Sequence, residues 1–262
     1  MLKKLRTLIA GRPAEAAPAA TIPAGQRVYA VGDIHGRLDL FQMLIERIEA
    51  DDAARGPADT TVILLGDLVD RGPDSAGVLR TARQWAATRQ VRTLAGNHEE
   101  MFLGSFERDD TLRHFLRHGG RETLLSFPID YDTYSRTTIE ELRALMPRFV
   151  PAEDVAFMRA MEDQIRIGDY LFVHAGIRPG VPLEEQQVSD LRWIRREFIQ
   201  DRSPRDFVVV HGHTITDEPE MMPLRIGVDT GAYASGRLTA IALEGRDRWL
   251  LVATGEASDT DA

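Results

Sequence analysis

Short runs of apolar residues recur along the chain, and each run ends directly in a small polar segment. The runs cover residues 27–31, 61–65, 91–95, 170–173 and 207–210. Their near-continuous apolar character predicts strands that are buried on both faces. The polar segments that follow contain Asp33 and His35, then Asp67, then Asn97 and His98, then His174, and finally His211 and His213.

The stretches between the first three runs predict helices, since residues 38–54 and 75–87 carry apolar side chains at helical spacing. This order is βαβαβ, which is typical of a parallel sheet. In such sheets ligands bind beyond the carboxyl ends of the strands, where loops from several strands converge. We therefore expect the polar segments to meet in one place.

The middle of the chain predicts a helical cap at about residues 100–164. Helical patterns cover 99–105, 111–118 and 153–162, with a Pro/Tyr/Asp-rich loop between them. After residue 207 strand patterns return at 224–228, 238–243 and 249–252, with turn signals between them. We expect these later strands to form a second sheet packed on the first.

The length of 262 residues suits one large domain, which we place at residues 27–255. Residues 1–26 contain an apolar patch too short for a signal peptide and then an Ala/Pro tract, so they predict a disordered leader; residues 256–262 predict a frayed tail. A few basic residues in the leader give only marginal attraction to a membrane. We expect a cytoplasmic protein with no membrane partner.

Charge and cysteine content exclude several functions. The chain has 32 basic and 41 acidic residues, a net charge of -9, which argues against a broad nucleic-acid-binding face. An anionic substrate would need positive charge supplied locally. Cysteine is absent, which excludes disulfides, thiolate metal sites and a cysteine-phosphatase mechanism.

The polar residues at the strand ends form a set of oxygen and nitrogen ligands suited to divalent manganese, iron or zinc. The set is Asp33, His35, Asp67, Asn97, His174 and His213. Six ligands are too many for one ion. With one carboxylate shared they fit two metals about 3.5 to 4 Å apart, the arrangement that clamps the attacking and leaving oxygens in a displacement at phosphorus.

Residues beside these ligands predict the remaining catalytic roles. Arg71 lies close to Asp67 in the sequence and can hold phosphate oxygens with two hydrogen bonds. His98 can protonate the leaving alkoxide if its ring is held. Asp70 is the natural residue to hold it, because a carboxylate fixes the imidazole tautomer and raises its pKa.

Five motifs resemble, in order and spacing, the calcineurin-like phosphoprotein phosphatase superfamily. They are Gly-Asp-Ile-His-Gly at 32–36, Gly-Asp-Leu-Val-Asp-Arg-Gly at 66–72, Gly-Asn-His-Glu at 96–99, His-Ala-Gly at 174–176 and Gly-His-Thr at 212–214. Residues 186–187, 193–195, 228–232 and 236–239 are similar to the small bacterial and phage-type serine/threonine protein phosphatases. The likeness covers roughly residues 27 to 244.

This resemblance implies a four-layer α/β/β/α sandwich with a helical cap insertion and two divalent ions, manganese first, with iron, zinc or nickel as alternatives. Asp33 and His35 would bind one metal, Asp67 would bridge, and Asn97, His174 and His213 would bind the other. Arg71, Arg195 and Asn97 would hold the phosphate, and His98 with Asp70 would form the acid pair. Ala95 departs from the family pattern, which has Arg in this place.

The predicted reaction is hydrolysis of phosphomonoesters by a metal-bridging hydroxide, with phosphoserine or phosphothreonine in proteins as the favoured substrates. The alternative is a symmetrical diadenosine tetraphosphatase. That family usually has Ala at the position of Asp70 and Asp at the position of Glu99. A non-catalytic scaffold is a third reading, and a nuclease is disfavoured. The sequence does not predict the oligomeric state.

Three residues keep a plain structural alternative. Arg195 reads equally as a charge on a helix surface. His211 suits a partner of a ligand or a purely structural residue. His114 and His118 lie four apart on a predicted helix but have no carboxylate to complete a metal site, so a solvated face is expected.

Overall fold

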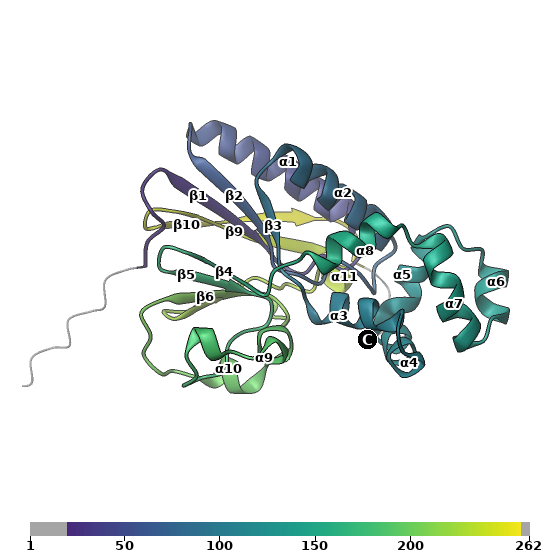
Figure 1. The fold of residues 1–262 in the computed structure, drawn as a ribbon. Helices are drawn as coiled ribbons and strands as arrows, with labels where there is room; N and C mark the ends of the chain where they lie inside the picture. Colours follow the sequence, from purple (N-terminus) through teal and green to yellow (C-terminus); the bar gives the residue numbers. More distant parts are fainter. Residues whose placement is uncertain (1–19, 258–262) are drawn as a thin grey trace, which may run out of the picture.

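The computed structural model describes residues 20–257, which form two five-stranded sheets packed face to face with helices outside them (Figure 1). The first sheet has the order β10-β9-β1-β2-β3 and the second the order β4-β5-β6-β8-β7. The strands are β1 (Gln26–Val31), β2 (Asp59–Leu64), β3 (Val91–Thr93), β4 (Gln164–Ile167), β5 (Tyr170–Val173), β6 (Val208–His211), β7 (Glu220–Met221), β8 (Arg225–Gly227), β9 (Arg237–Glu244) and β10 (Asp247–Thr254). The predicted α/β/β/α sandwich is confirmed.

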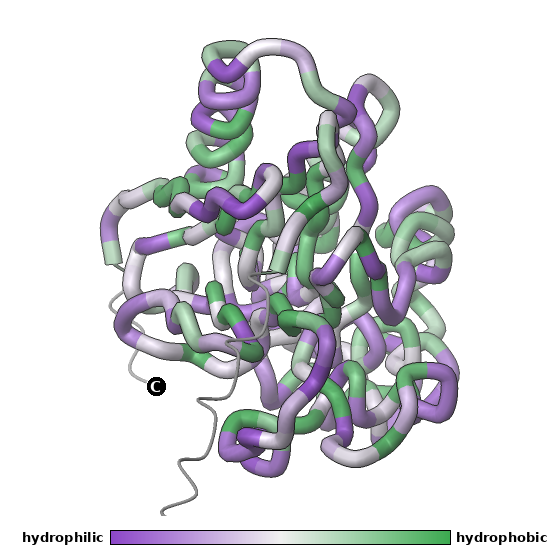
Figure 2. Tube along the Cα trace, turned by 90° about the vertical axis from the view of Figure 1, so that its left-hand side faces the viewer, coloured by the Kyte–Doolittle hydropathy of each residue, from purple (hydrophilic) through white to green (hydrophobic). Residues whose placement is uncertain are grey.

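Side chains of β1 explain why both faces of the first sheet are apolar. Tyr29 and Val31 pack in the cluster beneath α1 (Leu38–Arg55) and α2 (Ser75–Thr88). Val28 and Ala30 point the other way, into the layer between the sheets. Figure 2 shows hydrophobic segments gathered in the interior strands and hydrophilic ones on the outer turns. The burial of alternate residues on opposite faces is what the strand period of two requires.

The outer face of the second sheet is covered by two short helices, α9 (Val188–Trp193) and α10 (Arg196–Gln200). Leu191 and Phe198 from these helices pack on Leu171 and Val209 of the sheet. A 3-10 turn, η2 (Leu183–Glu185), precedes α9, and α11 (Ala232–Ser235) precedes β9. All four layers are therefore held by apolar contacts.

Two of the three later strands do not join the sheet that the sequence predicts, whereas β8 lies in the second sheet as expected. Strand β9 pairs antiparallel with β1, with Leu243 opposite Val28, and β10 pairs with β9, so both extend the first sheet. The second sheet begins earlier, with β4 and β5. The prediction is wrong because an apolar strand pattern shows that a strand is buried but not which distant strand it pairs with.

Helices fill the stretch where the sequence predicts the cap. They are α3 (Asn97–Ser105), α4 (Asp109–Phe115), the π-helical turn η1 (Leu116–Gly120), α5 (Arg121–Ser126), α6 (Tyr131–Arg136), α7 (Ile139–Phe149) and α8 (Ala152–Arg159). The predicted Pro/Tyr/Asp-rich loop is thus wrong, since α6 and α7 lie in it. Helix α7 starts at a capping box made by Thr138 and Glu141 and tolerates Pro147 in its interior.

The predicted leader is partly wrong at its boundary. Ile22 is 1% exposed and belongs to the core layer between the sheets, and its N–H donates to Gly245 O at 2.8 Å. Thr21 N–H donates to the Asp169 carboxylate at 2.9 Å. Residues 20–26 are therefore part of the fold, and the rest of the predicted leader, residues 1–19, lies outside the described residues. Of the predicted tail, Glu256 accepts a hydrogen bond from Arg37 at its backbone oxygen, and residues 258–262 are not described.

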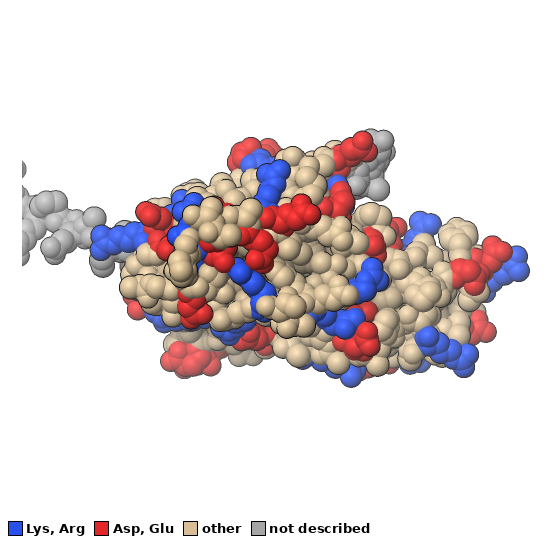
Figure 3. Space-filling model, turned by 90° about the horizontal axis from the view of Figure 1, so that it is seen from above, with Lys and Arg blue, Asp and Glu red and all other residues tan. Residues whose placement is uncertain are grey.

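Acidic and basic side chains are interspersed on the face of the molecule shown in Figure 3, without a broad area of one sign. This agrees with the moderate excess of acidic residues in the sequence. Between residues 20 and 257 no helix is both long enough and apolar enough to cross a membrane.

Candidate metal centre and catalytic site

The polar segments at the strand ends meet at one edge of the sandwich. Strands β1, β2 and β3 are parallel neighbours in the first sheet, and β5 and β6 are parallel neighbours in the second. The residues that their ends bring together are Asp33, His35, Asp67, Asp70, Asn97, His98, His174 and His213, none of them more than 4% exposed. Buried ionisable side chains in such density require mutual pairing or cations.

The backbone of this cluster is strained. Within residues 20–257 the non-glycine residues with positive φ are His35 (45°), Asp67 (51°), Asp70 (76°), Arg71 (68°) and His213 (62°). Each costs about 1 to 3 kcal/mol and persists only where the surrounding structure fixes it. All five are predicted site residues, so the strain is confined to the residues with a proposed chemical role.

One group of ligand atoms converges around His174. The His174 ring donates from Nδ1 to Leu65 O at 2.8 Å, which turns Nε2 toward the cluster. This Nε2 lies 3.0 Å from Asn97 Oδ1, 3.2 Å from His213 Nδ1 and 3.4 Å from Asp67 Oδ2. Four electron-pair donors facing one another in a buried space form the donor set of a divalent cation.

A second group shares Asp67. His35 donates from Nδ1 to Val69 O at 2.8 Å, and its Nε2 lies 3.6 Å from Asp67 Oδ2. His98 Nε2 lies 3.9 Å from the same oxygen. His35, Asp67 and His98 therefore offer three ligand atoms within 4.8 Å of one another, as do Asp67, His174 and His213. Asp67 is common to both groups, the position predicted for a bridging carboxylate.

Asp33 lies beside the two groups of ligand atoms. Its carboxylate belongs to neither group of converging atoms in the described part of the chain and instead accepts the His213 backbone N–H at 3.0 and 3.1 Å. Burial and the charge of Asp229 raise the pKa of Asp33 well above its usual value. In the structure His98, rather than Asp33, completes the group around His35.

His98 and Asp70 form the predicted pair. His98 Nδ1–H donates to Asp70 Oδ2 at 2.6 Å, which turns Nε2 toward the cluster. Asp70 is held in turn by Thr123 of α5, whose hydroxyl donates to Asp70 Oδ1 at 2.6 Å. Burial alone would lower the pKa of His98, but the charge of Asp67 and the bond to Asp70 raise it.

Arg71 spans the mouth of the second group. Its Nη1 lies 3.0 Å from His35 Nε2, and its Nη2 lies 3.1 Å from His98 Nε2. The face of its guanidinium lies 4.7 Å from the centre of the Tyr233 ring, and the edge of that ring meets His35. This contact uses the guanidinium face and leaves its N–H groups available to an anion.

Arg195 lies at the other group. Its Nη1 donates to the backbone oxygen of His213 at 3.1 Å, so this side chain reaches the cluster from the turn between α9 and α10. Arg195 and Arg196 are both exposed, but Arg196 donates to the Gln200 side chain of its own helix and not to the cluster. The position favours a site residue over the alternative of an ordinary charge on a helix surface.

Glu99 is a site residue to which the sequence assigned no role. It is fully buried, and its carboxylate accepts the backbone N–H groups of Gly96, Asp67 and Leu68 at 2.7 to 2.9 Å. It thereby fixes the loop that carries the shared carboxylate. A signal was present, because Glu three residues into a helix that follows a turn is the capping-box position.

Tyr233 and Asp229 were likewise not predicted as individual site residues. Both come from the 228–232 segment or its neighbour, which was noted only as part of the family pattern. Asp229 is 2% exposed and accepts the Gly231 N–H at 2.9 Å. Nothing in the spacing of Tyr233 indicates that it would lie against Arg71, since that contact joins segments far apart in the chain.

The electrostatics of the cluster fit bound cations. Burial would raise the pKa of Asp67, but the charges of His174 and His98 hold it well below its usual value. Burial lowers the pKa of His213 to about 2, and the charge of His174 adds to this effect. The Asp67 carboxylate and the His213 imidazole are thus in the deprotonated forms that metal ligation needs.

The remaining candidates lie away from the metal groups. His211 packs edge-on against Phe198 with ring centres 5.1 Å apart, and burial lowers its pKa to about 4. These contacts favour a purely structural role for His211 over a role as the partner of a metal ligand. His114 and His118 are exposed, as the prediction of a solvated face requires. Ala95 is 4% exposed and provides no cation.

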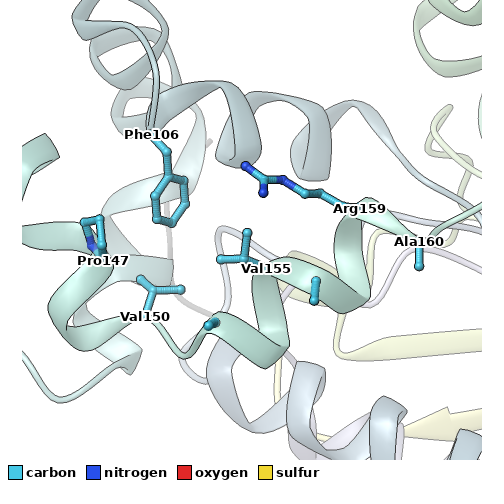
Figure 4. A pocket seen from close by; sticks show the side chains of 8 residues that line it. Phe106, Pro147, Val150, Val155, Arg159 and Ala160 are labelled. Carbon is cyan, nitrogen blue, oxygen red and sulfur yellow. The ribbon is translucent and has the colours of Figure 1, made fainter.

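A separate apolar hollow lies in the cap, between α3, α7 and α8 (Figure 4). It has a volume of about 520 Å³ and is lined by Phe106, Pro147, Val150, Ala152, Val155, Ala156, Arg159 and Ala160. None of these residues belongs to the polar cluster. The hollow therefore has no part in the chemistry described above.

Comparison with protein families gives a match to the calcineurin-like phosphoesterase model over residues 26–237. Among curated proteins, the chain is 26% identical over 234 residues to the asymmetrical bis(5′-nucleosyl)-tetraphosphatase PrpE of Bacillus anthracis, covering 80% of this chain and 88% of that protein. It is 28% identical over 226 residues to serine/threonine-protein phosphatase 1 of Salmonella typhimurium, covering 84% and 93%.

Solved structures show the same fold. A protein provisionally assigned as a diadenosine tetraphosphatase matches with a TM-score of 0.60 and 21% identity, over 90% of this chain and 100% of that one. A cold-active protein-tyrosine phosphatase of a Shewanella species matches with a TM-score of 0.54 and 19% identity, over 88% and 83%. At these identities the likeness concerns the fold alone.

Proposed function

The chain belongs to the calcineurin-like phosphoesterase family, and we propose that within this family it hydrolyses phosphomonoesters, with phosphoserine and phosphothreonine residues of proteins as its substrates. Membership makes it a metal-dependent hydrolase with a dinuclear site for divalent cations. The observation that carries the proposal is the convergence of His35, Asp67 and His98 on one side and Asp67, His174 and His213 on the other. Asn97 adds its amide oxygen to the second group.

Two divalent ions bound there would supply a hydroxide nucleophile at neutral pH and neutralise the charge that develops on the phosphate. Manganese is our proposed metal, because the donor set of carboxylate, amide oxygen and imidazole suits it, with iron, zinc and nickel as alternatives. Asp33 would bind the first metal with a free lone pair of its carboxylate, while it accepts the His213 N–H.

The cationic side chains bind and orient the substrate. Arg71 presents N–H groups at the edge of the cluster while Tyr233 supports its other face, so it can take two phosphate oxygens at once. Arg195 would approach the phosphate from the His213 side. These two residues supply locally the positive charge that the acidic chain lacks as a whole.

His98 would deliver the proton to the leaving oxygen from Nε2. Its Nδ1 is committed to Asp70, and Thr123 holds that carboxylate in place, so the ring cannot turn. The charge of Asp67 and the bond to Asp70 raise the pKa of His98, which favours the protonated ring that a general acid needs. Departure of the alkoxide as an alcohol then leaves inorganic phosphate between the two arginines.

Asp70 supports the choice of phosphoprotein substrates. Asp70 and Glu99 are the two positions at which the sequence differs from the symmetrical diadenosine tetraphosphatases. In the structure Asp70 accepts a hydrogen bond from His98, and Glu99 accepts one from the backbone N–H of Asp67. Similarity to the Salmonella serine/threonine-protein phosphatase adds support.

Cleavage of dinucleotide polyphosphates is the second candidate. It is favoured by similarity to the PrpE proteins, which are named as asymmetrical enzymes, rather than to the symmetrical type that the sequence suggested. Turnover of a phosphoserine peptide and of diadenosine tetraphosphate should be measured side by side with manganese. Our proposal predicts the larger kcat/KM for the peptide, and exclusive cleavage of the dinucleotide would reverse the ranking.

A scaffold without activity is tested by the same preparation. Manganese-loaded, folded protein should release nitrophenol from p-nitrophenyl phosphate. A complete lack of turnover with metal bound would refute the proposed reaction.

A further inference from the structure

The π-helical turn η1 of the cap lies directly on the phosphate-binding arginine. Arg71 N–H donates to Gly119 O at 3.0 Å. Gly119 has φ of 101°, and a Cβ added there would lie 2.6 Å from Arg71 Cγ, so no side chain fits between the turn and the arginine. The backbone angles of His118 and Gly119 are not helical, so the chain kinks between α4 and α5 at the place where it meets Arg71.

A second contact fixes the same part of the cap to the catalytic pair. Thr123, at the start of α5, accepts the Asp70 backbone N–H at 2.8 Å and donates its hydroxyl to the Asp70 carboxylate. The residues on either side of η1 are therefore anchored to Asp70 and Arg71. Side chains carried by η1 and the end of α4 stand beside the site.

Three of these side chains carry basic groups that lack acidic partners. The exposed side chains are His114, Arg117 and His118. Among residues 20–257, no carboxylate lies within 4 Å of their basic groups. Arg113 on the same helix is different, because it pairs with Asp110 at 3.2 Å and Glu140 at 3.4 Å.

The basic groups are close to one another and to the catalytic histidine. The rings of His114 and His118 lie 4.1 Å apart, and His118 Nδ1–H donates to His114 O at 2.8 Å. The pKa of His114 is lowered by burial and then by the charges of His118, Arg117 and His98. The cations around His114 disfavour its protonation, and an anion bound among these side chains would offset that effect.

We propose that His114, Arg117 and His118 form a second anion subsite beside Arg71, which binds a further phosphate group of the substrate. This inference rests on the proposed function, since it takes the scissile phosphate to lie at the metal cluster. The subsite favours substrates that carry at least two phosphates over simple monoesters. The second phosphate can belong to a polyphosphate chain or to a neighbouring phosphorylated residue of a peptide.

The test compares Arg117→Ala combined with His118→Ala against the control Arg113→Ala, which removes a cation of the same helix that is already paired. KM is measured for sodium tripolyphosphate and for p-nitrophenyl phosphate, and binding of tripolyphosphate to manganese-loaded protein is followed by calorimetry. We expect the ratio of the two KM values to rise about tenfold in the double variant, which corresponds to ~1.4 kcal/mol of lost binding free energy. The calorimetric Kd for tripolyphosphate should rise by a similar factor.

Two outcomes overturn the subsite. One is a KM ratio unchanged in the double variant although its melting temperature matches the wild type. The other is an equal change in Arg113→Ala, which would reduce the effect to general surface charge. If the wild type cleaves neither substrate, the proposed function fails instead, so the two failures are distinguishable.

The same variants separate the two sources of the second phosphate. A diadenosine tetraphosphate arm and a doubly phosphorylated peptide arm, each compared with its singly phosphorylated counterpart, are run in parallel. The arm whose preference for the second phosphate disappears in the double variant identifies the source. Loss of preference in neither arm contradicts the subsite.

Discussion

The metal cluster and the cap turn beside it both concentrate basic side chains, but they hold them in opposite ways. In the cluster, His35 and His174 are at most 2% exposed, and each commits one ring nitrogen to a backbone oxygen. In the cap turn, Arg117 and His118 are exposed and lack carboxylate partners among residues 20–257. The basic side chains of the cluster are therefore held by protein partners, whereas those of the cap turn face solvent.

On our proposals, the cluster carries the chemistry and the cap turn contributes to substrate selectivity. Strained backbone is found at His35, Asp67 and His213, where a small displacement would separate ligand atoms. Substitutions in the cluster should therefore abolish turnover for every substrate. Substitutions in the cap should change the ranking of substrates or the stability alone.

The largest effect is expected for Asp67→Asn, because Asp67 is common to both groups of ligand atoms. Turnover of p-nitrophenyl phosphate should fall by more than about 10³-fold, beyond the ~10² to 10³ of a single lost catalytic donor. Asp59→Asn, at the exposed start of the same strand, serves as the control. Retention of a tenth of the activity would remove Asp67 from its bridging position.

His98→Ala is the next largest. Turnover should fall by ~10² to 10⁴, the usual range for a general acid, while metal content is unchanged. Because His98 also lies within reach of the ligand group around His35, the metal content decides its role. A loss of one ion per chain would make His98 a ligand and return the proton transfer to another residue.

Arg71→Ala should act on binding more than on chemistry. Loss of charge-assisted hydrogen bonds of about 1.5 to 3 kcal/mol predicts a rise of roughly 10- to 150-fold in the inhibition constant of inorganic phosphate. Arg71→Lys keeps the charge but loses the planar fork and should recover only part of the affinity. Full recovery with Lys would mean that two-point binding by the guanidinium is unimportant.

Metal binding should depend on pH through His174. Although burial favours the neutral ring, the Asp67 carboxylate raises the pKa of His174 to about 10 in the metal-free fold. The ring is therefore protonated at neutral pH, so a cation must displace about one proton and its affinity should fall as the pH is lowered. Calorimetry of manganese binding in two buffers of different ionisation enthalpy measures this proton; a value of zero would contradict the assignment.

The smallest expected effect is a loss of stability in the cap. Thr138→Ala removes the residue that caps α7, and the free energy of unfolding should fall by about 1 kcal/mol. Turnover should stay the same, because Thr138 lies outside the cluster. A matched loss of activity and stability would show that the cap and the site are not separable.

The sequence predicts the cluster better than the cap for a physical reason. Asp67 and His174 each end an apolar strand, and parallel strands deliver their carboxyl ends to one edge whatever their exact pairing. The position of Asp33 depends instead on whether its carboxylate faces His35 or the His213 backbone. The hydrogen bond between Asp33 and the His213 backbone joins residues that are 180 positions apart. No local sequence pattern contains such a contact.

The cap and the sheet order depend on similar long-range contacts. Helix α6 buries no residue, and α7 depends on Leu142 and Met146 packing against distant residues, so their short patterns read as loop. Strand β9 carries an ordinary strand pattern, and only its pairing with β1 assigns it to the first sheet. The type of an element was therefore predictable where its side chains are extensively buried. The strands or helices that it contacts were not predictable.

The number of divalent ions bound per chain tests the central claim most directly. Purified protein should be stripped with a chelator, loaded with manganese, freed of excess metal and measured by elemental analysis. The convergence of two ligand groups on Asp67 predicts two ions per folded chain. One ion or none in correctly folded protein would contradict a dinuclear site.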